Sequence, residues 1–220
     1  MALFSRDSGV LLSDDGLLER LGVCRVRVDA EVDLAGWEEE LSKVTPLSIF
    51  AEDGSYAQYR NILEESDFPF GSILETIAPI LEKKFVDSVN ELRLDDAFAI
   101  HYSEQHRDTT VNLHTDPSDI TVNLCLGRSA DLEGSEVLFH GKERLKQGED
   151  DKNTGEYSRF RVGAIAGYAT IHWGRHPHEV TTLVKGSRTN VVLTYVFIDT
   201  TKSTAQCAGC YVTDASLSQV

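Results

Sequence analysis

The chain has few cysteines and no long apolar run, and these two absences exclude several kinds of protein. Only four of its 220 residues are cysteines, too few and too scattered for the disulfide framework of a small secreted protein. No stretch approaches the roughly 20 consecutive apolar residues of a membrane-spanning helix. Charged residues interrupt the first residues of the chain, which therefore lack the continuous apolar core of a signal peptide. We therefore expect a cytoplasmic protein, with one sizeable core because 41% of its residues are hydrophobic.

Basic residues are also scarce. The chain has 21 Lys and Arg against 36 Asp and Glu, and of the formal net charge of −15, residues 1–100 contribute −12 and residues 101–220 contribute −3. Such a chain lacks the basic surface that phosphate binding needs, so neither nucleic acid nor a membrane is an expected partner. The acidity either favours a basic protein substrate or only keeps the protein soluble. We expect any anionic ligand to bind in the less acidic half.

The last cysteines, Cys207 and Cys210, form an isolated C-x-x-C pair. A structural zinc site would need a second pair of ligands at suitable spacing, and the sequence offers none. We expect this pair not to bind metal, and its role stays open.

The first 94 residues are expected to be a mainly helical support region. Residues 15–21, 32–43 and 72–85 place apolar side chains at helical spacing. Asp33 is placed to cap the second of these helices. Pro79 should kink the third helix or mark a second start within it.

From about residue 95 the pattern changes to short alternating segments rich in Val, Ile, Thr and Tyr, which is typical of strands. The predicted strands are residues 96–102, 111–115, 119–126, 135–140, 159–166, 168–173, 178–183 and 188–198. Strands after a helical half indicate an α+β fold, a cupin-like jelly roll or double-stranded β-helix with the N-terminal helices packed on one sheet. We expect a single domain, with this core over residues 95–200 and a tail over 201–220. The polar stretch 141–158 is either a surface loop or a lid.

The stretch LHTDPSDITVNLCL, residues 113–126, contains the first candidate site. His114 and Asp116 are two positions apart, so in an extended segment their side chains leave the same face. An imidazole and a carboxylate on one face supply two ligands of a facial triad, which leaves coordination positions open on a non-haem Fe(II). The pair alone also fits a polar turn before a buried strand, so a third ligand is required.

A second histidine cluster, IHWGRHPHEVTTLVKGSR, supplies candidates for that ligand. If the turn at residues 185–187 closes a hairpin, His178 and Arg188 lie on adjacent strands. Arg188 would then bind a carboxylate bidentately beside a metal on His178. His176 shares strand parity with His178 and is the reserve ligand, whereas His172 lies in the preceding strand.

Strand parity predicts a pocket beside these residues. In the strand of residues 119–126, Thr121 and Asn123 share one face, and the apolar residues between them share the other. The strand that begins at Arg188 alternates in the same way. A polar row can therefore line a pocket while an apolar row is buried beneath the helices.

The pattern H-x-D, then about sixty residues, then H followed ten positions later by R resembles the Fe(II)- and 2-oxoglutarate-dependent dioxygenases. The segments YSEQHRDTTVNLHTDPSDITVNLCLG, EGSEVLFHG and IHWGRHPHEVTTLVKGSRTNVVLTYVF resemble more closely the prolyl 4-hydroxylase and lysyl hydroxylase branch, over residues 95–198. The resemblance implies three Fe(II) ligands: His114, Asp116 and His178. It also implies that Arg188 pairs with the distal carboxylate of 2-oxoglutarate.

The same resemblance implies further contacts to the cosubstrate. Tyr102, twelve residues before His114, matches a tyrosine whose hydroxyl reaches 2-oxoglutarate. Thr121 and Asn123 then face into the cosubstrate pocket. The chain departs from the branch at Ser135, where relatives usually have a second Gly, and in having Arg188 where prolyl hydroxylases generally have Lys, as lysyl hydroxylases do.

The implied activity is hydroxylation of a C–H bond on a peptidyl prolyl or lysyl residue. Fe(II), 2-oxoglutarate and O2 are the implied cofactors, with ascorbate as an auxiliary, and succinate and CO2 are the implied products. A free amino acid or another small metabolite is the alternative substrate. The alternative functions are an inactive metal-binding jelly roll and a cupin-like metalloenzyme that does not use 2-oxoglutarate.

Overall fold

The computed structural model describes residues 9–42, 58–106, 109–145 and 158–205. The helices in these ranges are α1 (Asp15–Leu21), α2 (Ala35–Ser42), α3 (Phe70–Lys84) and a 3-10 turn, η1 (Val89–Glu91). The first strands are β1 (Val10–Leu12), β2 (Val23–Arg27), β3 (Gln58–Asn61), β4 (Leu92–Ser103), β5 (Val111–His114) and β6 (Ile120–Arg128). The remaining strands are β7 (Glu133–Gly134), β8 (Val137–His140), β9 (Arg159–Val162), β10 (Tyr168–Trp173), β11 (His178–Val180), β12 (Leu183–Lys185) and β13 (Ser187–Phe197).

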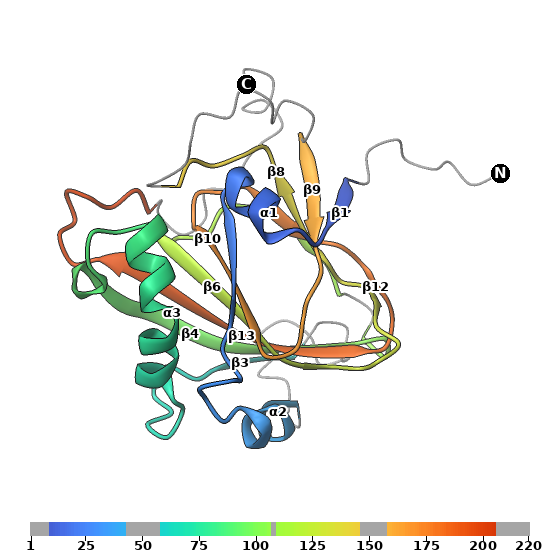
Figure 1. Cartoon of the computed structure of the whole chain (residues 1–220). Coiled ribbons are helices and arrows are strands. Elements are labelled where there is room, and N and C mark those ends of the chain that lie inside the picture. Colours follow the sequence, from blue (N-terminus) through green and yellow to red (C-terminus); the bar gives the residue numbers. More distant parts are fainter. Residues whose placement is uncertain (1–8, 43–57, 107–108, 146–157, 206–220) are drawn as a thin grey trace.

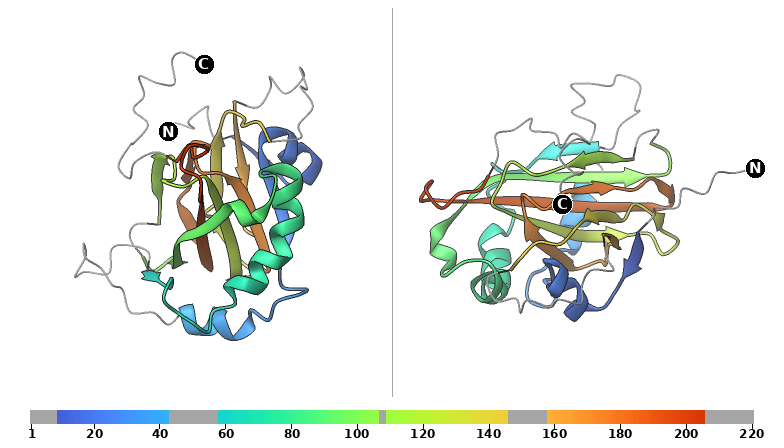
Figure 2. Two further views of the ribbon diagram at one scale, coloured as in Figure 1. Left: turned by 90° about the vertical axis from the view of Figure 1, so that its left-hand side faces the viewer. Right: turned by 90° about the horizontal axis from the view of Figure 1, so that it is seen from above.

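Two sheets build the body of the molecule (Figure 1). The five-stranded sheet has the order β1-β9-β8-β11-β5, and the six-stranded sheet has the order β2-β10-β6-β13-β4-β3. The long strands β4 and β13 run antiparallel side by side through the molecule (Figure 2). Residues of both sheets line one cleft between them. The predicted jelly roll is therefore confirmed.

The main hydrophobic core lies between the six-stranded sheet and the helices α2 and α3, which Figure 1 shows on one side of that sheet. The fully buried Ile73, Ile77 and Leu81 recur every four residues along α3 and form the stripe that faces the sheet. The apolar face of β6 packs into the same core, as strand parity predicts. Pro79 lies inside α3, which is continuous across it, so it marks no second start.

The helix α1 connects β1 of one sheet to β2 of the other. The side chain of Asp14 caps it by accepting a hydrogen bond from the backbone N–H of Leu17 at 2.6 Å. Gly22 ends it in the left-handed conformation, at a φ of 96°. The buried Leu18 and Leu21 of α1 belong to a second core with residues of β8 and β9. This helix therefore joins the two sheets at their β1 and β2 edges.

The structure differs from the predicted elements in the N-terminal region. Three short strands, β1, β2 and β3, extend the two sheets there, at the outer edges of the strand orders. Each is only three to five residues long, too short for alternation to reveal it, and its pairing with distant strands defines it. The helix predicted over residues 32–43, with Asp33 at its cap, is α2, which begins only at Ala35. The residue directly before it is therefore Leu34 and not Asp33. In the described residues, no helix combines the length and the apolar character needed to cross a membrane.

Ile77 provides a test of the core between α3 and the sheet. The substitution Ile77→Ala is expected to lower the free energy of unfolding by about 2–5 kcal/mol, because it removes buried methyl groups and leaves a cavity. Urea unfolding followed by circular dichroism measures the change. Ile198, 60% exposed, is the control, and Ile198→Ala should change the same quantity by less than about 0.5 kcal/mol. Equal losses in the two variants would contradict this packing.

Candidate metal centre and adjoining cleft

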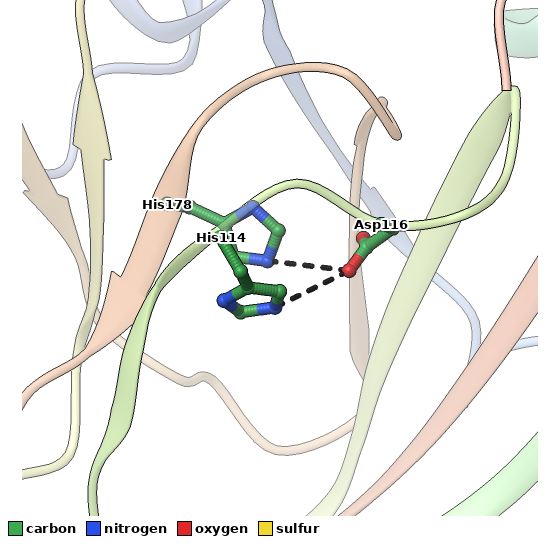
Figure 3. A group of neighbouring side chains, drawn as sticks. All are labelled: His114, Asp116 and His178. Atoms are coloured by element: carbon green, nitrogen blue, oxygen red, sulfur yellow. Dashed lines mark ion pairs between the residues drawn. The ribbon is translucent and has the colours of Figure 1, made fainter. Parts of the chain in front are cut away.

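Three of the predicted ligand residues come together at one end of the five-stranded sheet. His114 ends β5, and His178 begins β11 directly opposite it in the antiparallel register. Asp116 lies two residues beyond His114 and points at both rings (Figure 3). Its Oδ1 is 3.4 Å from Nε2 of His114 and 3.7 Å from Nε2 of His178. The ligand atoms of all three residues lie within 4.8 Å of one another, so one metal ion can contact all of them.

Hydrogen bonds orient each of these three side chains. Nδ1 of His114 donates to the carbonyl oxygen of Asn112 at 2.7 Å, and Nδ1 of His178 donates to that of His176 at 2.9 Å. Each ring therefore turns its Nε2 toward Asp116. The hydroxyl of Thr121 donates to the second carboxylate oxygen of Asp116 at 2.5 Å. Such outer partners fix the tautomer and the direction of metal ligands, and this donor set fits a divalent metal.

The electrostatics of His178 and Asp116 favour the forms that bind metal at neutral pH, whereas the pKa of His114 shifts toward the protonated form, which a metal ion must displace. Burial lowers the pKa of His178 to about 4, so its imidazole is neutral. Burial opposes ionisation of Asp116, but the neighbouring histidines and the Thr121 hydrogen bond outweigh it and hold the pKa of its carboxyl well below the usual range. Burial likewise opposes the charge on His114, but Asp116 outweighs it and raises the pKa of that ring. An ionised carboxylate and a neutral imidazole are the forms that bind metal.

An open cleft of about 560 Å³ adjoins the three residues and is lined by both sheets. Its apolar lining comprises Phe98, Ile100, Val111, Val137, Val180 and Val192. Its polar lining includes Thr121 and Asn123, as strand parity predicts. Apolar side chains thus make up about half of the lining, beside convergent polar groups, and such a pocket suits a small molecule.

Arg188 supplies the positive charge of this cleft. Its side chain is 2% exposed, and its guanidinium carbon lies 4.5 Å from the ring centre of Tyr102, the residue opposite it on β4. Its Nε donates to the hydroxyl of Ser135 at 2.8 Å. No carboxylate forms an ion pair with Arg188 in the part of the chain that the structure describes. Burial lowers its pKa, but a guanidinium keeps its proton, so this is a buried cation suited to an anionic ligand.

The sequence was compared with protein families and with curated proteins. No family model matches the chain. Two curated proteins of Arabidopsis thaliana, the 2-oxoglutarate and iron-dependent oxygenase domain-containing proteins ICU11 and CP2, are both 29% identical to it, over 133 and 129 residues, which is 58% of this chain. The chain spans 32%, about a third, of the length of each of these relatives.

Solved structures agree with these relatives. An oxidoreductase of the 2OG-Fe(II) oxygenase family from Burkholderia pseudomallei superimposes with a TM-score of 0.55 at 16% identity, over 86% of this chain and 95% of that one. HygX from Streptomyces hygroscopicus, with nickel and 2-oxoglutarate bound, gives 0.57 at 14% identity, over 86% and 88%. The epimerase SnoN, in complex with Fe3+, alpha-ketoglutarate and nogalamycin RO, gives 0.54 at 16% identity, over 84% and 85%. The chain has the fold of the 2-oxoglutarate- and Fe(II)-dependent oxygenases.

One prediction about this oxygenase fold was wrong. His178 and Arg188 do not lie on adjacent strands, because β11 belongs to the five-stranded sheet and β13 to the six-stranded sheet. After β11 the chain forms β12, which pairs with β7, and only then turns through Lys185 and Ser187 into the other sheet. Arg188 and His178 therefore line the same cleft from different sheets.

Among the other histidines, the structure separates those that reach the cleft from those that do not. The reserve ligand His176 is outside the group that can hold a metal, and its ring packs on Phe139 with centroids 4.8 Å apart. His172, which was not predicted to be a site residue, lines the cleft with its ring centroid 4.7 Å from that of His178. It lies opposite Thr121 in the register of β10 against β6. Residues opposite each other in a sheet point to the same face, so this register would have predicted that His172 faces the cleft together with Thr121.

Two predicted features fall outside the described residues. Most of the polar stretch 141–158, the predicted loop or lid, is among them, and so are Cys207 and Cys210. The alternatives stated for these segments stay predictions.

Proposed function

We propose that the protein is an Fe(II)- and 2-oxoglutarate-dependent oxygenase that hydroxylates a C–H bond. In this proposal His114, Asp116 and His178 hold Fe(II), and Arg188 binds the distal carboxylate of 2-oxoglutarate. The observation that carries the proposal is the position of Arg188, a buried cation without an acidic partner among the described residues, in the same cleft as a group suited to a divalent metal. A metal centre without this cosubstrate would have no use for such a cation.

The chain's own residues bind, orient and exclude water. Nε2 of each histidine and the carboxylate of Asp116 face one point, and they leave the opposite side open to the cleft. The Tyr102 ring restricts the guanidinium of Arg188 on one face, and we infer that Tyr102, Thr121 and Asn123 contact the cosubstrate. When bound, Fe(II) and 2-oxoglutarate supply the oxidation, in which O2, the cosubstrate and a C–H bond give succinate, CO2 and an alcohol.

Two substrate classes are candidates. The motif resemblance to the prolyl 4-hydroxylase and lysyl hydroxylase branch favours a peptidyl prolyl or lysyl residue. A small molecule is the second candidate, and two observations favour it: the apolar lining of the cleft, and the binding of nogalamycin RO by the similarly folded SnoN.

The activity can be tested without knowing the substrate. The purified protein, incubated with Fe(II), ascorbate, 2-oxoglutarate and O2, is expected to form succinate slowly, because these cofactors react even when no substrate takes the oxygen. Omitting 2-oxoglutarate, or adding a chelator, should abolish the signal. A protein that binds metal but neither binds nor consumes 2-oxoglutarate would be the inactive jelly roll or the cupin-like metalloenzyme, and the proposal would be wrong. Prolyl and lysyl peptides, and then small molecules, are next added to look for stimulated turnover.

A further inference from the structure

Ser135 has an unusual backbone conformation for a residue with a side chain. In the described part of the chain it is the one residue other than glycine with a positive φ, at 59°. Side chains disfavour this left-handed region, and a strained residue persists only where its surroundings hold it in place. The preceding Gly134 has a φ of 79°, and a Cβ there would lie 2.1 Å from the carbonyl oxygen of Thr182. The pairing of β7 with β12 therefore imposes a left-handed turn at which Ser135 is tolerated and Gly would be preferred.

The side chain of Ser135 has a specific partner. It is 1% exposed, and its hydroxyl accepts the Nε–H of Arg188 at 2.8 Å. The Tyr102 ring lies against one face of the guanidinium, and Ser135 binds its Nε edge. Together the two residues fix the orientation of the guanidinium plane. The two terminal Nη groups then remain for a ligand carboxylate.

We propose that Ser135 is a positioning residue that orients Arg188 for the distal carboxylate of 2-oxoglutarate. This inference rests on the proposed function and adds the group that fixes the cosubstrate anchor. Glycine would fit the backbone better, but it would leave the Nε–H of a buried guanidinium without this acceptor and let the group rotate. The hydrogen bond from Arg188 to this hydroxyl thus explains why a serine stands at a position where the backbone conformation favours glycine.

Two substitutions separate the hydroxyl from the backbone strain. Ser135→Gly removes both, whereas Ser135→Ala removes the hydroxyl and keeps the strain. The dissociation constants of 2-oxoglutarate and of 2-oxobutanoate, which lacks the distal carboxylate, are measured by calorimetry on the Fe(II)-loaded protein without O2. Both variants are expected to bind 2-oxoglutarate about tenfold more weakly, the size expected for a hydrogen bond to a charged group. The dissociation constant of 2-oxobutanoate should not change.

Thermal unfolding of the same variants gives the second readout. Ser135→Gly should unfold at a higher temperature than Ser135→Ala although both bind 2-oxoglutarate poorly, so stability and affinity would change independently. Ser88→Ala is the control, since the Ser88 hydroxyl caps η1 on an exposed turn, and it should leave both dissociation constants unchanged.

Three results would overturn the inference. Affinity for 2-oxoglutarate that stays within about twofold of the unsubstituted protein in both variants would show that the hydroxyl does not position Arg188. Equal weakening of 2-oxoglutarate and 2-oxobutanoate would show a general disturbance of the cleft. Failure of the unsubstituted protein to bind 2-oxoglutarate would overturn the proposed function as well, so the two failures are distinguishable.

Discussion

Asp116→Ala is expected to lower the affinity for Fe(II) by more than about 100-fold and to reduce succinate formation to background, because losing a direct ligand should exceed the 10- to 100-fold cost of losing an outer partner. The carboxylate is the only anion among the three proposed ligand residues, and Thr121 and the two rings converge on it. Without it, two imidazoles would hold the cation alone. Metal titration of the apoprotein measures the first loss, and uncoupled turnover measures the second.

Asp131→Ala is the matched control for this substitution. Asp131 is also an aspartate in an ion pair, with Lys185 at 3.2 Å, but its side chain is 53% exposed and lies outside the residues that line the cleft. Its removal should leave Fe(II) affinity and succinate formation unchanged. If Asp116→Ala behaved like Asp131→Ala, the three residues would not form the metal centre.

The sequence predicts the parts of this molecule that follow from local geometry. His114 and Asp116 share a face because they are two positions apart in an extended segment, and the structure shows both pointing at one place (Figure 3). The alternation of β6 separates Thr121 and Asn123 from the apolar residues that enter the main core. The stripe on α3 identifies the helix that covers that core. In each case the repeat of a single element carries the information.

The features that the sequence does not predict depend on contacts between residues far apart in the chain. A short turn before Arg188 suggested a hairpin with the strand of His178, but β12 pairs with β7 and carries the chain to the other sheet. The place of His172 beside the proposed ligand His178 depends on the register of β10 against β6. The contact between Ser135 and Arg188 joins residues 53 positions apart. Such pairings depend on the packing of the whole fold, which no local repeat encodes.

Arg188→Ala is expected to weaken 2-oxoglutarate binding by about 30-fold or more while Fe(II) affinity stays nearly the same. Removing one partner of a buried, hydrogen-bonded charge pair costs about 2–5 kcal/mol, and each 1.4 kcal/mol corresponds to about tenfold. Arg188→Lys should give an intermediate loss, since the ammonium keeps the charge but cannot bind a carboxylate through two parallel hydrogen bonds. Calorimetry with the Fe(II)-loaded protein measures 2-oxoglutarate binding, and titration of the apoprotein measures metal binding.

Arg175→Ala tests whether the position of Arg188, rather than its chemistry, causes the loss. Both arginines stack on an aromatic ring, because Arg175 lies over the Trp173 ring at 4.7 Å and Arg188 lies over that of Tyr102 at 4.5 Å. Arg175, however, forms an ion pair with Glu143 at 3.1 Å, and it does not line the cleft. Its removal should leave 2-oxoglutarate binding unchanged. Equal losses in the two alanine variants would mean that a stacked arginine supports the fold at both places, and Arg188 would no longer be the cosubstrate anchor.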